Sequence, residues 1–176
     1  IDLGAEVVDA LVAKTGVAVS EIDELIFGCV SQVGAQSSNI ARNICLSSVL
    51  GEVVPGTTVD RQCGSGQQAM HFAAQGVLSG TQDLVIAGGV ESMSQVPIGA
   101  NIIDGYKAEH GLPYGKKMSE RYPGVQFNQF AGAEMLAHKY ELTQNELNAF
   151  AFDSHVKAKR AVLEGRFKDE IVAIQI

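Results

Sequence analysis

In the first half of the chain, segments with hydrophobic residues at helical spacing alternate with short apolar segments that are typical of strands. Residues 2–16 have apolar side chains at helical spacing, with Asp2 placed to cap the helix and Gly16 to end it. The apolar face of this helix consists of Leu3, Val7, Val8, Leu11 and Val12. Residues 25–30 then form a nearly continuous apolar run, which is typical of a strand that is covered on both faces.

The same alternation continues to residue 90. Asn39 is placed to cap a second helix that turns Ile40, Ile44 and Val49 inward. Residues 53–62 and 84–90 have the composition of strands, and a third helix runs from about residue 63 to residue 79, before Gly80. The order helix, strand, helix, strand, helix, strand predicts an α/β fold with a parallel sheet.

The second half of the chain has a different pattern. Residues 95–127 contain three of the four prolines and no clear periodicity, which predicts a long loop. A helix is expected over residues 128–140. The spacing from Thr143 to Glu146 is that of a capping box and predicts another helix, which Gly165 ends. We expect a strand over residues 171–176.

The composition narrows the classes of protein to which the chain can belong. With 176 residues, 46% of them apolar, the chain is long enough for one packed domain and part of another. No apolar run is long enough to cross a membrane. The net charge of −7 lies in residues 1–92, which hold ten acidic and three basic residues, and this acidic excess disfavours a nucleic-acid surface.

The three cysteines, Cys29, Cys45 and Cys63, lie far apart in the sequence. Their spacing matches no zinc-binding pattern, and an odd number does not suit a disulfide framework. We therefore expect no metal site and a reducing compartment. Cys29 lies at the end of the first strand and Cys45 on the second helix, where both are expected to pack in the core.

Cys63 is the candidate nucleophile because it lies between a strand and a helix. The first N–H groups of a helix have no helical partner and the helix dipole adds partial positive charge, which together stabilise a thiolate. Gly64 and Gly66 have no side chain, so a substrate carbonyl can approach the backbone closely. The residues alone leave a second interpretation open, in which Cys63 is one more buried thiol.

Three other polar residues have mainly structural interpretations. Glu91 follows the third strand and is expected to be a buried carboxylate that is bonded to backbone groups. His71, on the third helix, is expected to be structural rather than catalytic. Arg42 has alternative positions: in solvent, which residue statistics favour, or at the active-site edge or a partner subunit.

Four segments of the chain resemble motifs of the thiolases. Residues 57–66, Thr-Thr-Val-Asp-Arg-Gln-Cys-Gly-Ser-Gly, resemble the segment around the acylated cysteine of that family. Residues 87–94 resemble the thiolase pattern Ala-Gly-Gly-x-Glu-Ser-Met-Ser, and residues 28–42 and 164–172 resemble two further elements. Because the four occur in family order over nearly the whole chain, the sequence is similar to the N-terminal half of a thiolase.

The resemblance implies a layered α/β/α fold with a parallel sheet, of which this chain would hold an incomplete N-terminal half. Residues 1–92 would form the core without its first strand. Residues 93–176 would form the first part of the inserted loop domain, ending before the core strand that closes the half. The family's Gly-His-Pro, Cys-x-Gly and Asn-Glu-Ala-Phe motifs do not occur in this sequence. We therefore expect the chain alone to lack part of the catalytic apparatus.

By resemblance, the protein is an acetyl-CoA acyltransferase or acetyltransferase with ping-pong kinetics. Cys63 would carry an acyl group between 3-ketoacyl-CoA, or acetyl-CoA, and CoA, with its backbone N–H as an oxyanion donor. CoA is then a substrate, and no cofactor is expected. The substrate would also be contacted by Gly64, Gly66, Asn128, Gln129 and Phe130. Residues 128–130 differ from the His-Met-Gly-like stretch of short-chain members, which argues against a preference for acetoacetyl-CoA.

Two alternatives stay open on the sequence. One is a condensing enzyme of the β-ketoacyl synthase type, which has a similar fold and nucleophile but lacks the motif at residues 87–94. The other is a catalytically incomplete fragment that binds acyl-CoA. The resemblance further implies fatty acid degradation, a homodimer or homotetramer, no nucleic-acid or membrane partner, and a bacterial-like cytoplasmic location, with an organelle left open.

Overall fold

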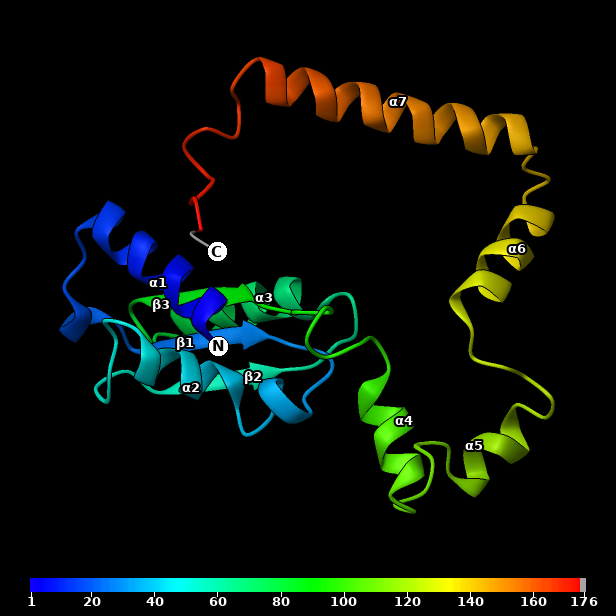
Figure 1. Cartoon of the computed structure of the whole chain (residues 1–176), viewed down its shortest axis with the longest axis horizontal. Helices are drawn as coiled ribbons and strands as arrows, with labels where there is room; N and C mark the ends of the chain where they lie inside the picture. The colour runs from blue at the N-terminus through cyan, green and yellow to red at the C-terminus, as the bar shows by residue number, and fades with distance from the viewer. Residues whose placement is uncertain (175–176) are drawn as a thin grey trace. The chain divides into compact units, whose positions relative to one another are not determined.

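A computed structural model describes residues 1–174, and the chain divides into two compact units, residues 1–113 and residues 114–173. The first unit contains the sheet, and the second contains helices and their connections (Figure 1). The predicted division into a core over residues 1–92 and a loop domain over residues 93–176 stays a prediction.

The first unit alternates helices and strands in the predicted order. Its helices are α1 (Asp2–Thr15), α2 (Ile40–Ser47), α3 (Ser65–Leu78) and α4 (Ala100–Lys107), and its strands are β1 (Glu24–Gly28), β2 (Gly56–Val59) and β3 (Val85–Gly89). The sheet has the order β2-β1-β3 and both pairings are parallel, with Ile26 opposite Thr57 on one side and Ala87 on the other. The predicted α/β fold with a parallel sheet is therefore confirmed.

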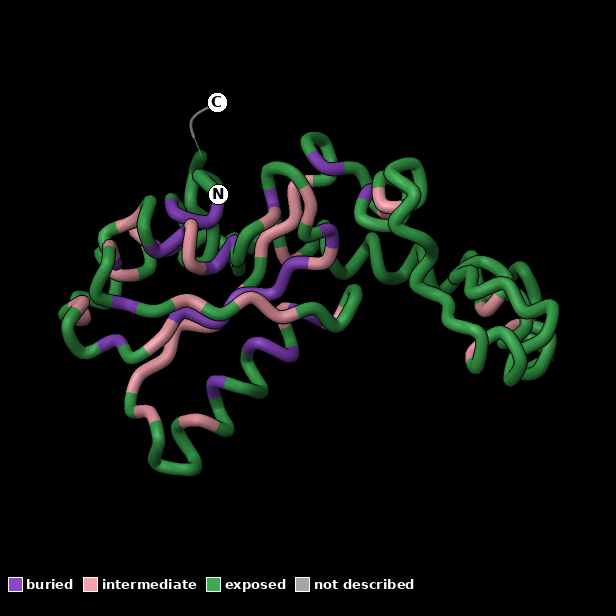
Figure 2. The backbone as a smooth tube through the Cα atoms, turned by 90° about the horizontal axis from the view of Figure 1, so that it is seen from below, coloured by how far each residue is buried: buried purple, intermediate pink, exposed green. Residues whose placement is uncertain are grey.

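Both faces of β1 are buried, which explains its continuous apolar sequence. Leu25 and Phe27 pack into a core with residues of α1 and α2 such as Ile44. Ile26 points to the opposite face and packs against Ala69 of α3. Figure 2 shows the buried residues gathered along β1, whereas the helices of the second unit are exposed along most of their length. The sheet is thus the middle layer of an α/β/α arrangement.

The buried face of α1 differs from the predicted one. Asp2 is the first helical residue rather than the cap, and Ile1 occupies the N-cap position without a side-chain bond. The helix meets α2 at Gly4, whose Cα faces the side chain of Ile44. Since a glycine allows this close approach, the helix turns Gly4, Ala5 and Val8 inward. Of the predicted face, Val8 is buried and Val12 partly buried, whereas Leu3, Val7 and Leu11 remain exposed. Gly16 ends the helix as predicted, with a left-handed φ of 69°.

The elements around β2 are shorter than predicted. The second helix ends at Ser47, so Val49 lies outside its register and is 53% exposed rather than buried. The strand covers Gly56–Val59, and residues 60–62 leave the sheet to form the turn before α3. The strand ends there because the backbone of these residues bonds within the turn instead of to β1.

Asn39 connects α2 to β2. Its side chain accepts the N–H of Arg42, which confirms the predicted cap, while its amide donates to the Gly56 carbonyl at 2.8 Å and it accepts the Thr58 hydroxyl at 2.8 Å. Arg42 donates to the Val54 carbonyl at 2.8 Å. The expectation of a freely solvated Arg42 is therefore wrong, because its guanidinium holds the connection between α2 and β2.

Glu91 joins the segments that follow β1 and β3. Its carboxylate accepts the N–H of Val30 at 2.7 Å, the N–H of Ser31 at 3.1 Å and the side-chain amide of Gln36 at 2.9 Å. Gln36 is buried and in turn accepts the N–H of Ser92 at 2.6 Å. The predicted bonds to backbone are confirmed, but Glu91 is half-buried rather than buried as expected. Burial opposes ionisation of Glu91, but the donors outweigh it and hold the pKa of Glu91 below its ordinary value.

The carboxyl end of β1 lies directly against the start of α3. A Cβ on Gly28 would lie 2.5 Å from the Gly66 nitrogen and 2.7 Å from the Ser65 Cβ, closer than real Cβ atoms approach any neighbour. A Cβ on Gly89 would lie 3.0 Å from the Gly28 carbonyl oxygen. The glycines that end β3, Gly88 and Gly89, therefore allow close packing within the sheet.

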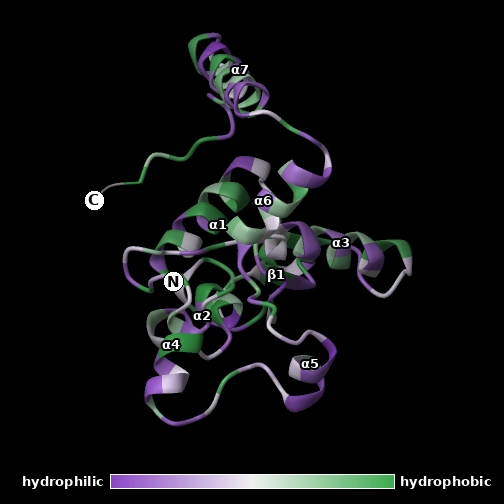
Figure 3. Cartoon of the chain, turned by 90° about the vertical axis from the view of Figure 1, so that its right-hand side faces the viewer, coloured by the Kyte–Doolittle hydropathy of each residue, from purple (hydrophilic) through white to green (hydrophobic). Residues whose placement is uncertain are grey.

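The second unit contains α5 (Lys116–Arg121), α6 (Gln129–Lys139) and α7 (Gln144–Leu163). Asn128 caps α6, and Thr143 and Glu146 form the predicted capping box at the start of α7. Hydrophilic and hydrophobic residues are mixed along α7 (Figure 3), and nearly all of them are exposed. Within residues 1–174, no helix combines the length and the apolar character needed to cross a bilayer.

Two predictions for the second half are wrong. The segment 95–127 is not one long loop, because α4 and α5 occupy residues 100–107 and 116–121. Gly99, in a left-handed conformation with φ 82°, and Gly115 precede these helices, so their starts lie at residues that the sequence pattern assigned to the loop. Residues 171–174 form no strand, and residues 175–176 of the predicted strand lie outside the described residues.

We expect Gly28→Ala to destabilise the first unit by about 1–3 kcal/mol, the usual cost of forcing a methyl group into a packed site. The added Cβ would meet backbone atoms of Ser65 and Gly66, which move only if α3 moves. Urea unfolding followed by circular dichroism measures the change. Gly105→Ala is the matched control, because nothing lies within 4 Å of its Cβ position in α4. A Gly28→Ala variant as stable as the parent would contradict the close packing.

The Glu91 carboxylate is expected to stabilise the fold at neutral pH and to lose this contribution in acid. Because its folded pKa is lowered, the contribution is complete above the ordinary value of 4.5 and disappears as the pH falls through the folded pKa. Glu91→Gln turns an NH2 group toward backbone donors, so we expect a loss of about 1–3 kcal/mol at neutral pH and less in acid.

Urea unfolding at about pH 7 and at about pH 3 measures this difference. Glu52→Gln, at an exposed position of the same unit, is the control and should change neither value. An equal loss at both pH values would mean that the charge of Glu91 does not contribute.

Candidate active site

Cys63 lies in the turn between β2 and α3, two residues before the first helical residue. The helix begins at Ser65, and Gly64 occupies the N-cap position. Among residues 1–174, Cys63 is the one exposed cysteine, whereas Cys29 and Cys45 are buried. The interpretation of Cys63 as one more buried thiol is therefore wrong, and the predicted core positions of Cys29 and Cys45 are confirmed.

The turn that carries Cys63 has a left-handed residue directly before the thiol. Gln62 has φ 50°, a conformation that L-residues rarely adopt. Its N–H donates to the Asp60 carboxylate at 2.8 Å. The Ser65 hydroxyl accepts the N–H of Arg61 at 2.9 Å and donates to the Gln62 carbonyl at 2.5 Å. Side chains on both sides of Cys63 thus hold the backbone in this conformation.

A cavity of about 550 Å³ lies at the carboxyl edge of the sheet, and Cys63 is part of its wall. We call it the Cys63 cavity. All of its lining residues belong to the first unit: Gly28, Cys29, Val30, Ser31, Gln62, Cys63, Ser65, Gly66, Gly89, Val90, Glu91, Met93, Ile98, Gly99, Asn101 and Ile102. Apolar side chains from α4 and the segment before it form one wall, so the cavity can hold a hydrophobic group next to the thiol.

Cys29 is the second thiol that lines this cavity, and it is protonated and buried. Burial, together with the charge of the nearby Glu91 carboxylate, raises the pKa of Cys29 to about 11. Cys29 is therefore protonated at neutral pH, and with 1% of its surface exposed it is not available to a substrate. Burial also raises the pKa of Cys45. Of the three thiols, Cys63 has both the access and the position that nucleophilic chemistry needs.

The structure brings together some of the predicted site residues. Cys63 and Gly66 line the same cavity, and Gly64 is the N-cap beside them. Asn128, Gln129 and Phe130 lie at the start of α6 in the second unit, where Asn128 accepts the N–H of Phe130 as the helix cap. Their predicted contact with substrate stays a prediction.

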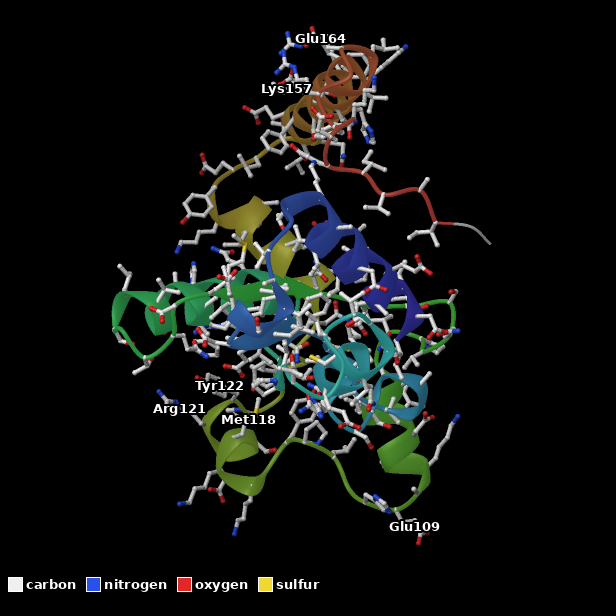
Figure 4. The ribbon with its side chains drawn as sticks, turned by 90° about the vertical axis from the view of Figure 1, so that its left-hand side faces the viewer. Glu109, Met118, Arg121, Tyr122, Lys157 and Glu164 are labelled. Atoms are coloured by element: carbon white, nitrogen blue, oxygen red, sulfur yellow. The ribbon has the colours of Figure 1, made fainter. Side chains whose placement is uncertain are left out.

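The second unit has a cavity of its own, of about 450 Å³, around an aromatic cluster. Phe127 stacks on Tyr114 with ring centroids 5.9 Å apart and meets Tyr122 edge-on at 5.7 Å. The guanidinium of Arg121 lies 5.6 Å from the Tyr122 ring, and Figure 4 shows the two side chains next to each other at the end of α5. Asn128 lines this cavity, so its cap position also borders the aromatic cluster.

Sequence reasoning missed Ser65, Ile98 and Ile102, which line the Cys63 cavity, and Gln36, which binds the Glu91 carboxylate beside it. The hydroxyl of Ser65 was treated as part of a motif without a role of its own, although it bonds to both residues before Cys63. Gln36 looked like an ordinary loop residue, and no periodic signal distinguishes a buried glutamine. Ile98 and Ile102 belong to the segment that was predicted to be a loop. His71 is exposed on α3 and does not line the cavity.

The structure offers no alternative centre based on a metal ion among its described residues. No group of three or more His, Cys, Asp or Glu side chains in residues 1–174 is placed to bind one.

Comparisons with known proteins agree with the sequence motifs. The chain matches the family model of the thiolase N-terminal domain over residues 1–176. It is 40% identical over 177 aligned residues to a Mycobacterium tuberculosis protein named steroid 3-ketoacyl-CoA thiolase FadA6, with 99% of this chain and 44% of that protein covered. It is 39% identical to proteins named 3-ketoacyl-CoA thiolase from Bacillus subtilis, covering 99% of this chain and 42% of that relative, and from Acinetobacter baumannii, covering 98% and 42%.

The chain thus spans less than half the length of these relatives. Within that span, the family match extends over every residue, and the parallel α/β sheet agrees with the fold that the motifs implied. This chain belongs to the thiolase family and lies within its N-terminal domain.

Proposed function

We propose that this chain supplies the nucleophile of an acyl-CoA acyltransferase and that Cys63 is this nucleophile. The observation that carries the proposal is the contrast between the exposed thiol of Cys63, which lines a partly apolar cavity, and the buried thiols of Cys29 and Cys45. The names of the relatives favour 3-ketoacyl-CoA thioesters as substrates. CoA and acetyl-CoA are then the second substrate and a product.

In the degradative direction, the Cys63 thiolate attacks the C3 carbonyl of a 3-ketoacyl-CoA. The C2–C3 bond breaks, its electron pair stays on C2, and a proton added at C2 releases acetyl-CoA. The acyl group remains on Cys63 as a thioester until the thiolate of free CoA attacks it and releases the cysteine as a thiolate. In the synthetic direction Cys63 carries an acetyl group that a second acetyl-CoA takes. Both directions are two-step covalent catalysis with ping-pong kinetics.

The surroundings of Cys63 support this chemistry. The start of α3 directs the partial positive charge of the helix dipole toward the turn, which favours the oxyanion that forms on the attacked carbonyl. The N–H of Cys63 is our proposed donor to that oxyanion. Gly64 and Gly66 leave the backbone open to the thioester.

The apolar wall of the cavity has a separate proposed role. Met93, Ile98 and Ile102 line the same space as Cys63, so they would contact the acyl chain. The cavity volume of about 550 Å³ lies within the usual range of small-molecule sites, roughly 300–1,000 Å³. Contacts of residues 128–130 with CoA, and assembly as a homodimer or homotetramer, are implied by the family resemblance and remain proposals.

We expect incubation with acetyl-CoA or acetoacetyl-CoA to add one acetyl group to the protein, and Cys63→Ala to abolish the addition. Intact mass spectrometry measures the adduct, and peptide mapping identifies its position. Cys45→Ala is the matched control, because it removes a buried thiol and leaves Cys63 in place. An adduct that persists in Cys63→Ala would contradict the assignment of the nucleophile.

The measurement is made on the 176-residue chain and on the complete polypeptide that contains it. Labelling of both would mean that the surroundings of Cys63 in this chain are enough to activate it. Labelling of the complete polypeptide alone would mean that groups outside the 176-residue chain are required, such as the histidine of the family's Gly-His-Pro motif. No adduct on either folded protein with these donors or with longer 3-ketoacyl-CoA thioesters would overturn the proposal in favour of an acyl-CoA-binding fragment.

A further inference from the structure

We propose that Ser65 is a positioning residue for Cys63: its hydroxyl holds the left-handed turn that presents the thiol to the Cys63 cavity. The proposal rests on Cys63 as the nucleophile of the proposed function. Its physical content, that the Ser65 hydroxyl controls the position and reactivity of the Cys63 thiol, is testable without any acyl transfer.

The Ser65 hydroxyl is both a donor and an acceptor of hydrogen bonds to the two residues before Cys63. It accepts the N–H of Arg61 at 2.9 Å and donates to the carbonyl of Gln62 at 2.5 Å. The side chain is 4% exposed, so water cannot readily replace either bond. Removing the hydroxyl would leave two backbone groups near the thiol without this partner.

These bonds do not cap the helix. Ser65 is the first residue of α3, and the N-cap residue, Gly64, makes no side-chain bond. The hydroxyl is directed backwards, to residues 61 and 62, rather than forwards to the unpaired N–H groups of the helix. Its effect is therefore on the conformation of the turn more than on the stability of α3.

The turn needs such support because of Gln62. A left-handed conformation costs a non-glycine residue about 1–2 kcal/mol relative to the common backbone regions. Gln62 has φ 50°, and its neighbours oppose relaxation from both sides: Asp60 accepts its N–H at 2.8 Å, and Ser65 binds its carbonyl. The Gln62 carbonyl also accepts the N–H of Ser65 at 3.0 Å, so loss of the hydroxyl leaves this backbone bond but removes the two side-chain bonds that fix the peptide leading into Cys63.

Ser65 is itself held in place by the sheet. The Ser65 Cβ lies 2.7 Å from the position where a Cβ on Gly28 would be, so it packs directly against the end of β1. The Ser65 hydroxyl thus connects a rigid element, the end of the central strand, to the strained residue before the nucleophile. Substitution of Ser65 should therefore affect the Cys63 thiol more than substitution of Ser79, the C-cap residue at the other end of α3.

The test measures the rate at which iodoacetamide alkylates each cysteine in the folded full chain, by quantitative peptide mass spectrometry. We expect Ser65→Ala to slow alkylation of Cys63 by about three- to tenfold, the change expected when a hydrogen bond that orients the thiol is lost. Ser79→Ala is the matched control, because it removes a hydroxyl that bonds to the Gly76 carbonyl at the other end of α3. It should leave the Cys63 rate unchanged.

A second readout separates positioning from a general loss of structure. Cys29 and Cys45 are buried, so their alkylation reports on opening of the core. Positioning requires that the Cys63 rate falls in Ser65→Ala while Cys29 and Cys45 stay protected. A Cys63 rate within twofold of the parent, or labelling of the two buried cysteines along with it, would overturn the proposal.

Gln62→Gly supplies the mechanism-specific test. Glycine adopts positive φ without strain, so the turn should depend less on Ser65 in this background. We expect Ser65→Ala to have a smaller effect on Cys63 alkylation in Gln62→Gly than in the parent, a non-additive result typical of residues that act on one feature. Equal effects in both backgrounds would overturn the role assigned to Gln62. If acyl-CoA donors leave no adduct on Cys63 but alkylation still depends on Ser65, then the proposed function fails and this inference stands.

Discussion

The close approach of α3 to the carboxyl end of β1 is the contact on which the site depends. It requires that Gly28 has no side chain, because a Cβ there would overlap the backbone of Ser65 and Gly66. The approach fixes where the helix starts, and the helix start fixes where the turn with Cys63 lies relative to the sheet. Glu91 adds to this by joining the segments after β1 and β3. Its carboxylate binds Val30 and Ser31, so two segments that line the Cys63 cavity are connected to each other.

Two thiols line the cavity at the edge of the sheet, and they differ in exposure: Cys29 is buried and Cys63 is exposed. Cys29 continues directly from β1 and is buried beside a carboxylate, which keeps it protonated. Cys63 lies on a turn that leaves the sheet toward the start of a helix, where it is exposed. The two thiols at this cavity thus differ in access, because Cys29 is buried at the end of the central strand and Cys63 is exposed on the turn before α3.

Local signals explain how much of this was predictable from the sequence. Gly16, Asn39 and the Thr143 capping box ended or started helices as expected, because each acts on backbone groups within a few residues of itself. The place of Cys63 between a strand and a helix made it a candidate nucleophile and left a buried thiol open, and the resemblance of residues 57–66 to a family motif favoured the first interpretation. Its exposure, the burial of Gln36 and the bonds of Ser65 depend on segments that meet only in the folded chain, and no periodic pattern encodes them. For the same reason the packing of Gly4 against Ile44 overrode the predicted face of α1.

The capping box of α7 has a consequence for the order in which the chain folds. Thr143 and Glu146 satisfy each other's backbone groups within a single turn, so the most costly step of helix formation, the first turn, needs no partner from elsewhere. Segments of this kind form within about a microsecond. The sheet, by contrast, must join residues such as Asp23 and Asp83, which are 60 positions apart. The start of α7 therefore depends on contacts that are local in sequence, whereas the Cys63 cavity requires closure of the long loop between β1 and β3, the kind of contact that slows folding.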